Sequence, residues 1–190
     1  AQLAAIAVAQ PGNRYEAIHD AARRVLTEGL VAFGILPRDV EESLAMHHDR
    51  EFYMHSTGHW LGMDVHDVGD YRVDRQSRVL EPGMVLTVEP GLYFDPARTV
   101  ATYALRAYSD VEIRERRDQL GIAAASKLER EEQEHAPKIA HPIPPEFRGI
   151  GIRIEDDVLS TAHGKEVLTR GTPKTIEEVE RACADASPLP

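Results

Sequence analysis

The residues best suited to chemistry are three histidines gathered within sixteen positions, between Met54 and Gly69: His55, His59 and His66. Imidazole both ligates transition metals and moves protons near neutral pH, so clustered histidines indicate a metal site or a catalytic site. Glycines at positions 58, 62 and 69 punctuate the stretch and allow the backbone to turn or to approach a ligand closely. The stretch is therefore the first candidate for a functional site, against the alternative of a surface loop.

The spacing of His55 and His59 matches that of the two histidines in the zinc-protease motif His-Glu-x-x-His, which lies on a helix. Here Ser56 stands where the motif places its general-base glutamate, and Gly58 disfavours a helix. The sequence therefore excludes that motif.

A predicted strand carries the first candidate carboxylate. Between Met84 and Glu89, Met84, Leu86 and Val88 alternate with Val85, Thr87 and Glu89, and Pro90 ends the ladder because it has no N–H to donate. Burying a glutamate is costly unless it is paired or bound to metal, so Glu89 is either a ligand or sits at an exposed strand end.

A second predicted strand, Gly149–Val158, places Arg153 and Glu155 on one face, where the arginine favours the ionised carboxylate. A plain ion pair is the alternative. Given the histidines and Glu89, a metal site is the more economical interpretation, and one imidazole with two carboxylates suits Mn²⁺ or Co²⁺.

Helices are expected at three places. Residues 14–33 are predicted to form a helix that ends at Gly34, with His19 expected on the surface. The side chains at helical spacing, which define its expected buried face, are Ile18, Ala22, Val25, Gly29 and Phe33. Asp39 caps a second, short helix. The last helix begins near the capping box Thr175–Glu178, or after Thr172-Pro173, and buries Cys183 on its apolar stripe.

Composition favours one globular domain: the chain has 190 residues, of which 42% are hydrophobic and 28% charged. A net charge of −10 argues against nucleic-acid and anionic-membrane partners, and no apolar run is long enough to cross a bilayer. The single cysteine excludes an internal disulfide framework and suits the cytoplasm. The start lacks Met and a basic leader and reads like the middle of a helix, so we expect a truncated chain.

The residues from His55 to Asp67 resemble the signature of the proline-peptidase branch of the pita-bread metallopeptidases (family M24), the Xaa-Pro aminopeptidases (aminopeptidase P) and prolidases. Two further blocks, Glu81–Tyr93 and Phe147–Val158, are similar to that family as well. The resemblance covers about residues 1–95 and 144–190. It implies an α+β pita-bread fold, incomplete at its N-terminus, of which residues 1–190 form the C-terminal part.

The resemblance implies two divalent metal ions, expected to be Mn²⁺ with Co²⁺ or Zn²⁺ as alternatives, held by two Asp, one His and two Glu. Matched residue by residue, His59 is the histidine ligand, Glu89 ligates one metal, and Glu155 bridges both. Glu89 is also expected to assist proton transfer.

The catalytic residues that the resemblance implies are His55, His66, Glu89 and Arg153. His55 and His66 would line the substrate site, and Arg153 would orient the carboxylates. The implied substrate is a peptide with proline in second position, from which the N-terminal residue is released. A homo-oligomer is expected for the complete enzyme.

The chain departs from the family at the two aspartate ligands, whose hairpin would precede its first helix. Nothing here matches that hairpin, and Asp64, Asp67 and Asp70 lie inside the histidine stretch. With three of five ligands, the isolated chain is expected to bind metal weakly and to hydrolyse peptides slowly or not at all.

A second departure is the segment between Glu89 and Glu155, whose 65 residues are more than is usual in the family. We interpret residues at about 96–143 as a charged, helix-prone insertion. Alternatives to the aminopeptidase are a prolidase acting on Xaa-Pro dipeptides, a creatinase-like amidinohydrolase and a non-catalytic pita-bread binding module.

Overall fold

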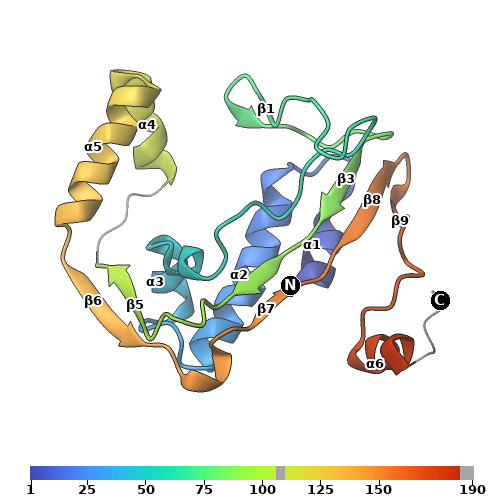
Figure 1. Ribbon diagram of the computed structural model, residues 1–190. Helices are drawn as coiled ribbons and strands as arrows, with labels where there is room; N and C mark the ends of the chain where they lie inside the picture. The colour runs from blue at the N-terminus through green and yellow to red at the C-terminus, as the bar shows by residue number, and fades with distance from the viewer. Residues whose placement is uncertain (106–109, 185–190) are drawn as a thin grey trace. The chain divides into compact units, whose positions relative to one another are not determined.

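The computed structural model describes residues 1–105 and 110–184, which form two compact units (Figure 1). Unit 1 comprises Ala1, His19–Ser56 and Gly91–Arg153, and unit 2 comprises Gln2–Ile18, Thr57–Pro90 and the chain from Ile154 onward. The chain passes between the units at several points, so each unit is assembled from segments distant in sequence.

Unit 1 is a mixture of helices and short antiparallel strand pairs, in which β4 pairs with β7 and β5 with β6. Its elements are α2 (Glu16–Ala32, which begins in unit 2), α3 (Val40–Ala45), the 3₁₀ helix η1 (His48–Glu51), β4 (Gly91–Tyr93), β5 (Val100–Ala104), α4 (Asp110–Leu120), α5 (Ile122–His135), β6 (Lys138–Pro142), the 3₁₀ helix η2 (Pro145–Phe147) and β7 (Gly151–Arg153).

Helix α2 confirms the predicted helix over residues 14–33. The turn that ends it closes at Gly34, whose φ of +66° suits glycine, and the Ile35 N–H returns to the Leu30 carbonyl at 2.9 Å. Its buried face differs in part from the predicted one. Val25 and Phe33 are exposed, whereas Thr27 and Leu30 are buried, because the face that packs is rotated from the one the apolar spacing suggested.

The core of unit 1 joins α2 and the segment after it to η1 and the β5–β6 pair. The buried side chains are Leu30, Ile35, Leu36, Phe52, Phe94, Ala101, Tyr103 and Ile143. Tyr103 donates its hydroxyl to the Ile35 carbonyl at 3.0 Å, and burial raises its pKa well above the ordinary value. Asp39 caps α3 as predicted, accepting from the Glu42 N–H at 2.9 Å.

Unit 2 is built on a three-stranded antiparallel sheet with the order β3-β8-β9. Its elements are α1 (Gln2–Val8), β1 (Arg72–Val73), β2 (Gln76–Ser77), β3 (Val85–Val88), β8 (Asp156–Thr161), β9 (Gly164–Val167) and α6 (Ile176–Ala184). Leu86, Val88 and Val158 are fully buried. The sheet therefore supplies the rigid frame on which the candidate residues of this unit are placed.

The single strand predicted over Gly149–Val158 is two strands, β7 and β8, which pair with β4 and β3 respectively. The break falls at Ile154-Glu155 and matches Glu89-Pro90 between β3 and β4. Proline cannot donate to a ladder, so the pairing is interrupted there on both strands.

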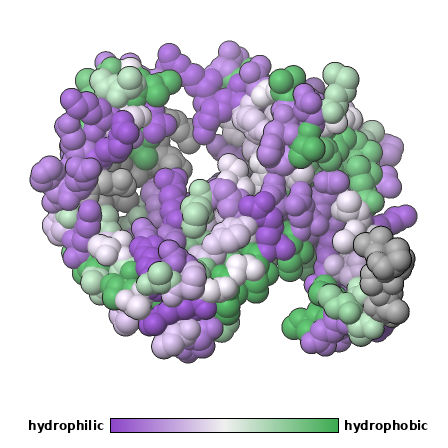
Figure 2. All heavy atoms as spheres, in the orientation of Figure 1, coloured by the Kyte–Doolittle hydropathy of each residue, from purple (hydrophilic) through white to green (hydrophobic). Residues whose placement is uncertain are grey.

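The charged segment contains two helices, α4 and α5, and Figure 2 shows mostly hydrophilic side chains over this pair. Arg116 and Glu132 form an ion pair of 2.5 Å between the helices. The predicted helix-prone character is confirmed. In the part of the chain described, no helix has both the length and the apolar composition needed to span a membrane.

Helix α6 begins with the predicted capping box. The Glu178 N–H donates to Thr175 Oγ1 at 3.2 Å, and the Thr175 N–H donates to the Glu178 carboxylate at 3.1 Å. The Lys174 N–H, which donates to the same carboxylate at 3.1 Å, and then the Thr175 bonds hold the pKa of Glu178 below its ordinary value. The prediction that Cys183 packs is wrong, because its side chain is exposed on a helix that has no buried residue.

Candidate active site

The histidine stretch lies along β3 and is held there by main-chain hydrogen bonds. The Thr87 N–H donates to the His59 carbonyl at 2.9 Å, and the Leu61 N–H donates to the Val85 carbonyl at 3.0 Å. Gly58 permits this approach, since a Cβ at that position would stand 1.9 Å from the Thr87 carbonyl oxygen. The stretch therefore behaves as an added edge strand whose side chains are fixed relative to β3.

His59 and Glu89 form the closest pair of candidate residues, with His59 Nε2 at 3.2 Å from Glu89 Oε1. The other ring nitrogen, Nδ1, lies 2.9 Å from the Trp60 carbonyl, which can only accept, so Nδ1 carries a proton. In the neutral ring, Nε2 would then turn a lone pair toward the carboxylate. Only a proton or a metal ion at Nε2 makes that contact favourable, and backbone-bonded histidines of this kind are typical metal ligands.

Thr87 holds both partners of this pair and was not recognised in the sequence. Its hydroxyl accepts from the His59 N–H at 3.0 Å and donates to Glu89 Oε1 at 3.0 Å. The side chain is buried, so these bonds replace water. The signal was available, because Thr87 and Glu89 are two apart on a strand and share a face.

The β3–β8 register brings the second glutamate into line with the first. Val88 pairs with Asp156, so the next position sets Glu89 opposite Glu155, and the Ile154 N–H continues the pattern by donating to the Pro90 carbonyl at 3.4 Å. Side chains of opposed residues leave the same face of a sheet, and like charges there repel. Two carboxylates in these positions favour a cation between them.

His66 lies beside His59, with ring centroids 4.1 Å apart in an edge-on arrangement, and its side chain is exposed. The loop that carries it is closed by the Asp67 N–H, which donates to the Trp60 carbonyl at 3.0 Å. Trp60 is itself stacked on Tyr71 with centroids 5.3 Å apart. Aromatic packing and a loop hydrogen bond thus position His66.

The remaining candidates, His55 and Arg153, meet within unit 1. Arg153 Nη2 lies 3.4 Å from His55 Nε2, and Arg153 Nε donates to the Tyr93 hydroxyl at 2.7 Å. Because arginine can only donate, His55 Nε2 accepts, and the protonated Nδ1 donates to the Ser56 carbonyl at 2.7 Å. This cluster presents a neutral imidazole and a guanidinium. Tyr93 is a second residue that the sequence interpretation quoted without giving it a role.

His19 is also part of unit 1's polar interior, which corrects the expectation of a surface position. Its Nδ1 lies 3.4 Å from the Tyr53 hydroxyl, and the Tyr53 ring packs edge-on against His55 at 5.1 Å. Burial, and then the nearby Arg23, lower the pKa of His19 to about 4. The residue is therefore neutral at pH 7 and supports the layer behind His55.

The donor types present suit a divalent ion, but they form an incomplete set. Across residues 1–105 and 110–184, no three His, Cys, Asp or Glu side chains gather as a group that could hold a metal. The structure joins His59 with Glu89 and His66, and His55 with Arg153. The assignment of all three ligands therefore stays a prediction.

Comparison with known proteins places this geometry in a family. The model of metallopeptidase family M24 matches residues 1–162. A Haemophilus influenzae Xaa-Pro aminopeptidase is 38% identical over 180 residues, which cover 95% of this chain and 32% of the relative. A human Xaa-Pro dipeptidase is 37% identical over 188 residues, covering 92% of this chain and 32% of that protein.

A solved structure of Pseudomonas aeruginosa aminopeptidase PepP superimposes with a TM-score of 0.71 at 40% identity, covering 96% of this chain and 32% of that one. The likeness confirms the predicted α+β pita-bread fold class. The chain spans about a third of the length of the curated relatives it matches. It belongs to metallopeptidase family M24.

Proposed function

We propose that this chain supplies part of the active site of a metal-dependent aminopeptidase that releases the N-terminal residue from peptides with proline in second position. The observation that carries the proposal is His59, whose Nδ1 donates to a main-chain carbonyl while Nε2 faces the Glu89 carboxylate at 3.2 Å. That arrangement is typical of a metal ligand. The similarity to proteins named Xaa-Pro aminopeptidase supports the reaction and the substrate.

The residues that would hold metal are His59, Glu89 and Glu155. The opposed carboxylates favour a divalent cation, and the mixture of imidazole and carboxylate suits Mn²⁺, or Co²⁺ or Zn²⁺ in its place. A bound ion of this kind acts as a Lewis acid on the scissile carbonyl and on water. With one imidazole and two carboxylates, the chain alone is expected to bind such ions weakly, and further ligands would complete the site.

The chain's own residues would move protons and orient the peptide. Glu89, held by Thr87, would take the proton released as water is consumed. His66 is exposed beside His59 and would hydrogen-bond the peptide. His55 and Arg153 would bind the peptide through the neutral imidazole and the guanidinium, which Tyr93 orients.

The wider organisation belongs to the same proposal. Residues 1–190 would form the C-terminal part of one pita-bread domain, with an insertion at about 96–143, in a cytoplasmic homo-oligomer. Neither nucleic acid nor membrane would be a partner, given the net charge of −10.

The metal assignment can be tested by paramagnetic line broadening in NMR spectra of the chain. Mn²⁺ should broaden signals of His59, Glu89 and Glu155 first, even when binding is weak. The variants E89Q and E155Q should lose this broadening, whereas E166Q, an exposed change on β9 of the same sheet, should keep it. Preferential broadening along α4 and α5 would contradict the assignment.

The reaction can be tested by following release of the first residue from three peptides by the native protein: Ala-Pro-Phe, Ala-Pro and Ala-Ala-Phe. We expect Ala-Pro-Phe to be cleaved fastest. Cleavage of Ala-Pro alone would favour the dipeptidase, which the human relative's 37% identity keeps as the second candidate. Cleavage of Ala-Ala-Phe at the rate of Ala-Pro-Phe would contradict the specificity for proline.

A further inference from the structure

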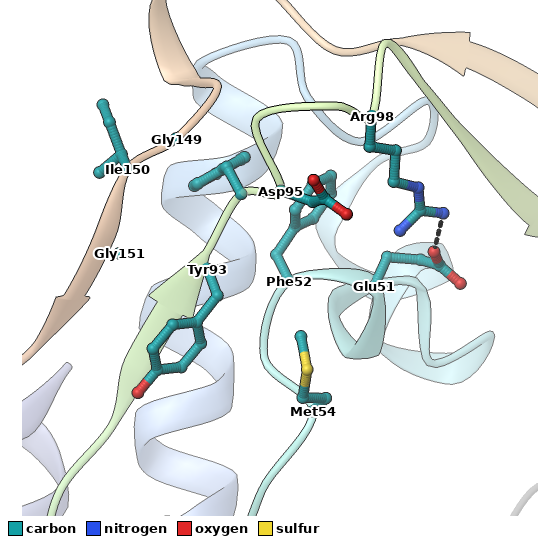
Figure 3. A pocket seen from close by; sticks show the side chains of 10 residues that line it. Glu51, Phe52, Met54, Tyr93, Asp95, Arg98, Gly149, Ile150 and Gly151 are labelled. Atoms are coloured by element: carbon teal, nitrogen blue, oxygen red, sulfur yellow. Dashed lines mark hydrogen bonds and ion pairs between the residues drawn. The ribbon is translucent and has the colours of Figure 1, made fainter.

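Two groups of charged side chains have no role in the function proposed above. Figure 3 shows the first, in unit 1, where Arg98 donates to the Glu51 carboxylate beside a pocket of about 460 Å³. About a third of each of these side chains is exposed, and exposed ion pairs contribute little. The second group, in unit 2, is centred on Asp156, whose side chain is only 4% exposed. The buried group requires an explanation, because an unpaired charge in the interior is costly.

Asp156 stands on the inward face of β8, where the alternation along a strand usually places an apolar side chain. Val158 and Ser160, which share that face, are buried as well, whereas Glu155 is exposed. Adjacent residues of an extended chain point to opposite faces, so the carboxylates of Asp156 and Glu155 leave the chain in opposite directions. Bonds that fix the Asp156 side chain therefore also fix the main chain from which Glu155 projects.

The Asp156 carboxylate accepts hydrogen bonds from three side chains. Thr169 Oγ1 donates to Oδ1 at 2.6 Å and Lys174 Nζ donates to the same oxygen at 2.9 Å, while Gln2 Nε2 donates to Oδ2. The Thr169 hydroxyl also accepts from the Asp157 N–H at 2.9 Å. These donors, one of them a cation, replace the water that a buried carboxylate loses.

Lys174 is itself held in place by the loop that follows β9. Its ammonium also donates to the Thr169 carbonyl at 3.1 Å and to the Thr172 carbonyl at 2.9 Å, so its three N–H groups are all engaged. The Thr172 N–H returns to the Thr169 carbonyl at 2.9 Å, and the Leu168 N–H donates to the Asp157 carbonyl on β8 at 2.8 Å. The loop is therefore joined to the strand and presents a preorganised cation.

The anchored point coincides with the break between β7 and β8. At this break Pro90 offers no N–H, and the Ile154 N–H donates to the Pro90 carbonyl at a long 3.4 Å. The ladder alone therefore holds the chain weakly beside Glu155. Because the Glu155 side chain is exposed, its own packing does little to fix its position.

We infer that Asp156, Thr169 and Lys174 are positioning residues for Glu155. They act through the main chain, by holding the start of β8 so that the Glu155 carboxylate stays opposite Glu89. The inference rests on the proposed function, in which both glutamates are metal ligands. It gives the loop after β9, which is distant in sequence from the histidine stretch, a part in the same site.

The test compares amide hydrogen exchange with Mn²⁺ affinity in two variants, Thr169→Val and Lys174→Met. Each removes a donor to Asp156, so the Ile154 amide should exchange about tenfold faster, while the Ser160 amide, which donates to Met84 farther along β8, should keep its rate. The Mn²⁺ concentration that half-broadens the NMR signals of the two glutamates should rise about tenfold, as is usual when the residues behind a metal ligand are changed.

Two matched variants serve as controls. Thr169→Ser keeps the hydroxyl and should retain wild-type exchange and Mn²⁺ affinity. Lys165→Met removes an ammonium from β9 of the same sheet, where it donates to the Ala7 carbonyl at 3.0 Å, and should leave both measurements unchanged.

Equal acceleration of the Ile154 and Ser160 amides would overturn the inference, because it would show that the cluster only stabilises the fold. Unchanged Mn²⁺ affinity in both Thr169→Val and Lys174→Met, or an equal loss in Lys165→Met, would overturn it as well. If Mn²⁺ broadens neither glutamate in the wild type, the proposed metal site fails. The exchange comparison then still decides whether the cluster holds the chain at Glu155.

Discussion

Replacing Thr87 with valine should separate the hydroxyl's contribution from that of the side chain's volume. Valine has nearly the same shape, so packing around the buried position is retained. The variant removes the acceptor for the His59 N–H and the donor to Glu89, two bonds of 3.0 Å each. Removing two hydrogen bonds made by a buried hydroxyl, one of them to a carboxylate, costs about 1–3 kcal/mol for each bond, so we expect a loss of about 3 kcal/mol in unfolding free energy.

The assay is urea unfolding at pH 7, followed by the fluorescence of Trp60, the only tryptophan in the chain. Thr87→Ser keeps the hydroxyl and loses one methyl group, so it should cost only about 1 kcal/mol. Thr102→Val makes the same chemical change at an exposed position of β5 and should cost less than about 0.5 kcal/mol. If the serine variant is as unstable as the valine variant, the hydroxyl is not what joins His59 to Glu89.

Two further predictions concern stability. Gly58→Ala should destabilise the chain in urea by about 3 kcal/mol, because the added Cβ would lie 1.9 Å from the Thr87 carbonyl oxygen. Gly29→Ala is the control: an added Cβ there has no atom within 4 Å, so the change should stabilise α2 by up to about 1 kcal/mol. Equal effects of the two substitutions would refute the packing argument. Because the pKa of His19 is lowered from 6.5 to about 4, its neutral form stabilises the fold fully above pH 6.5, and this contribution is lost as pH falls toward 4. Between pH 7 and pH 4, the free energy of unfolding should therefore fall by roughly 3 kcal/mol more in the wild type than in the His19→Gln variant. Parallel pH profiles of the two proteins would show that His19 is not buried.

The features that could be predicted from the sequence are those encoded over a few residues. Alternation over Met84–Glu89 identified β3 and set Glu89 at its end. Gly34 marked the end of α2, and the Thr175–Glu178 spacing identified the start of α6, because caps depend on residues one turn apart. Local chemistry of this kind does not require knowledge of the partner strands.

The features that were missed depend on which segments meet. Thr87 gains its role only because the histidine stretch lies against β3, and Tyr93 gains its role only because Arg153 on β7 reaches its hydroxyl. The division of Gly149–Val158 into two strands follows from Pro90 on the partner segment. His19 was misplaced for the same reason, since its burial comes from Tyr53, which lies far from it in sequence.

The pairing of β5 with β6 bears on how the chain folds. Glu89 and Glu155 can face each other only after a loop of 65 residues has closed, and such closure is slow when contacts are distant in sequence. If Val100–Ala104 and Lys138–Pro142 pair first, the open part of that loop shrinks to roughly 25 residues, which lowers its closure cost by about 0.8 kcal/mol. The long segment between the two glutamates therefore adds little to the entropic cost of joining their strands, and the β5–β6 pair is expected to form before β3 meets β8.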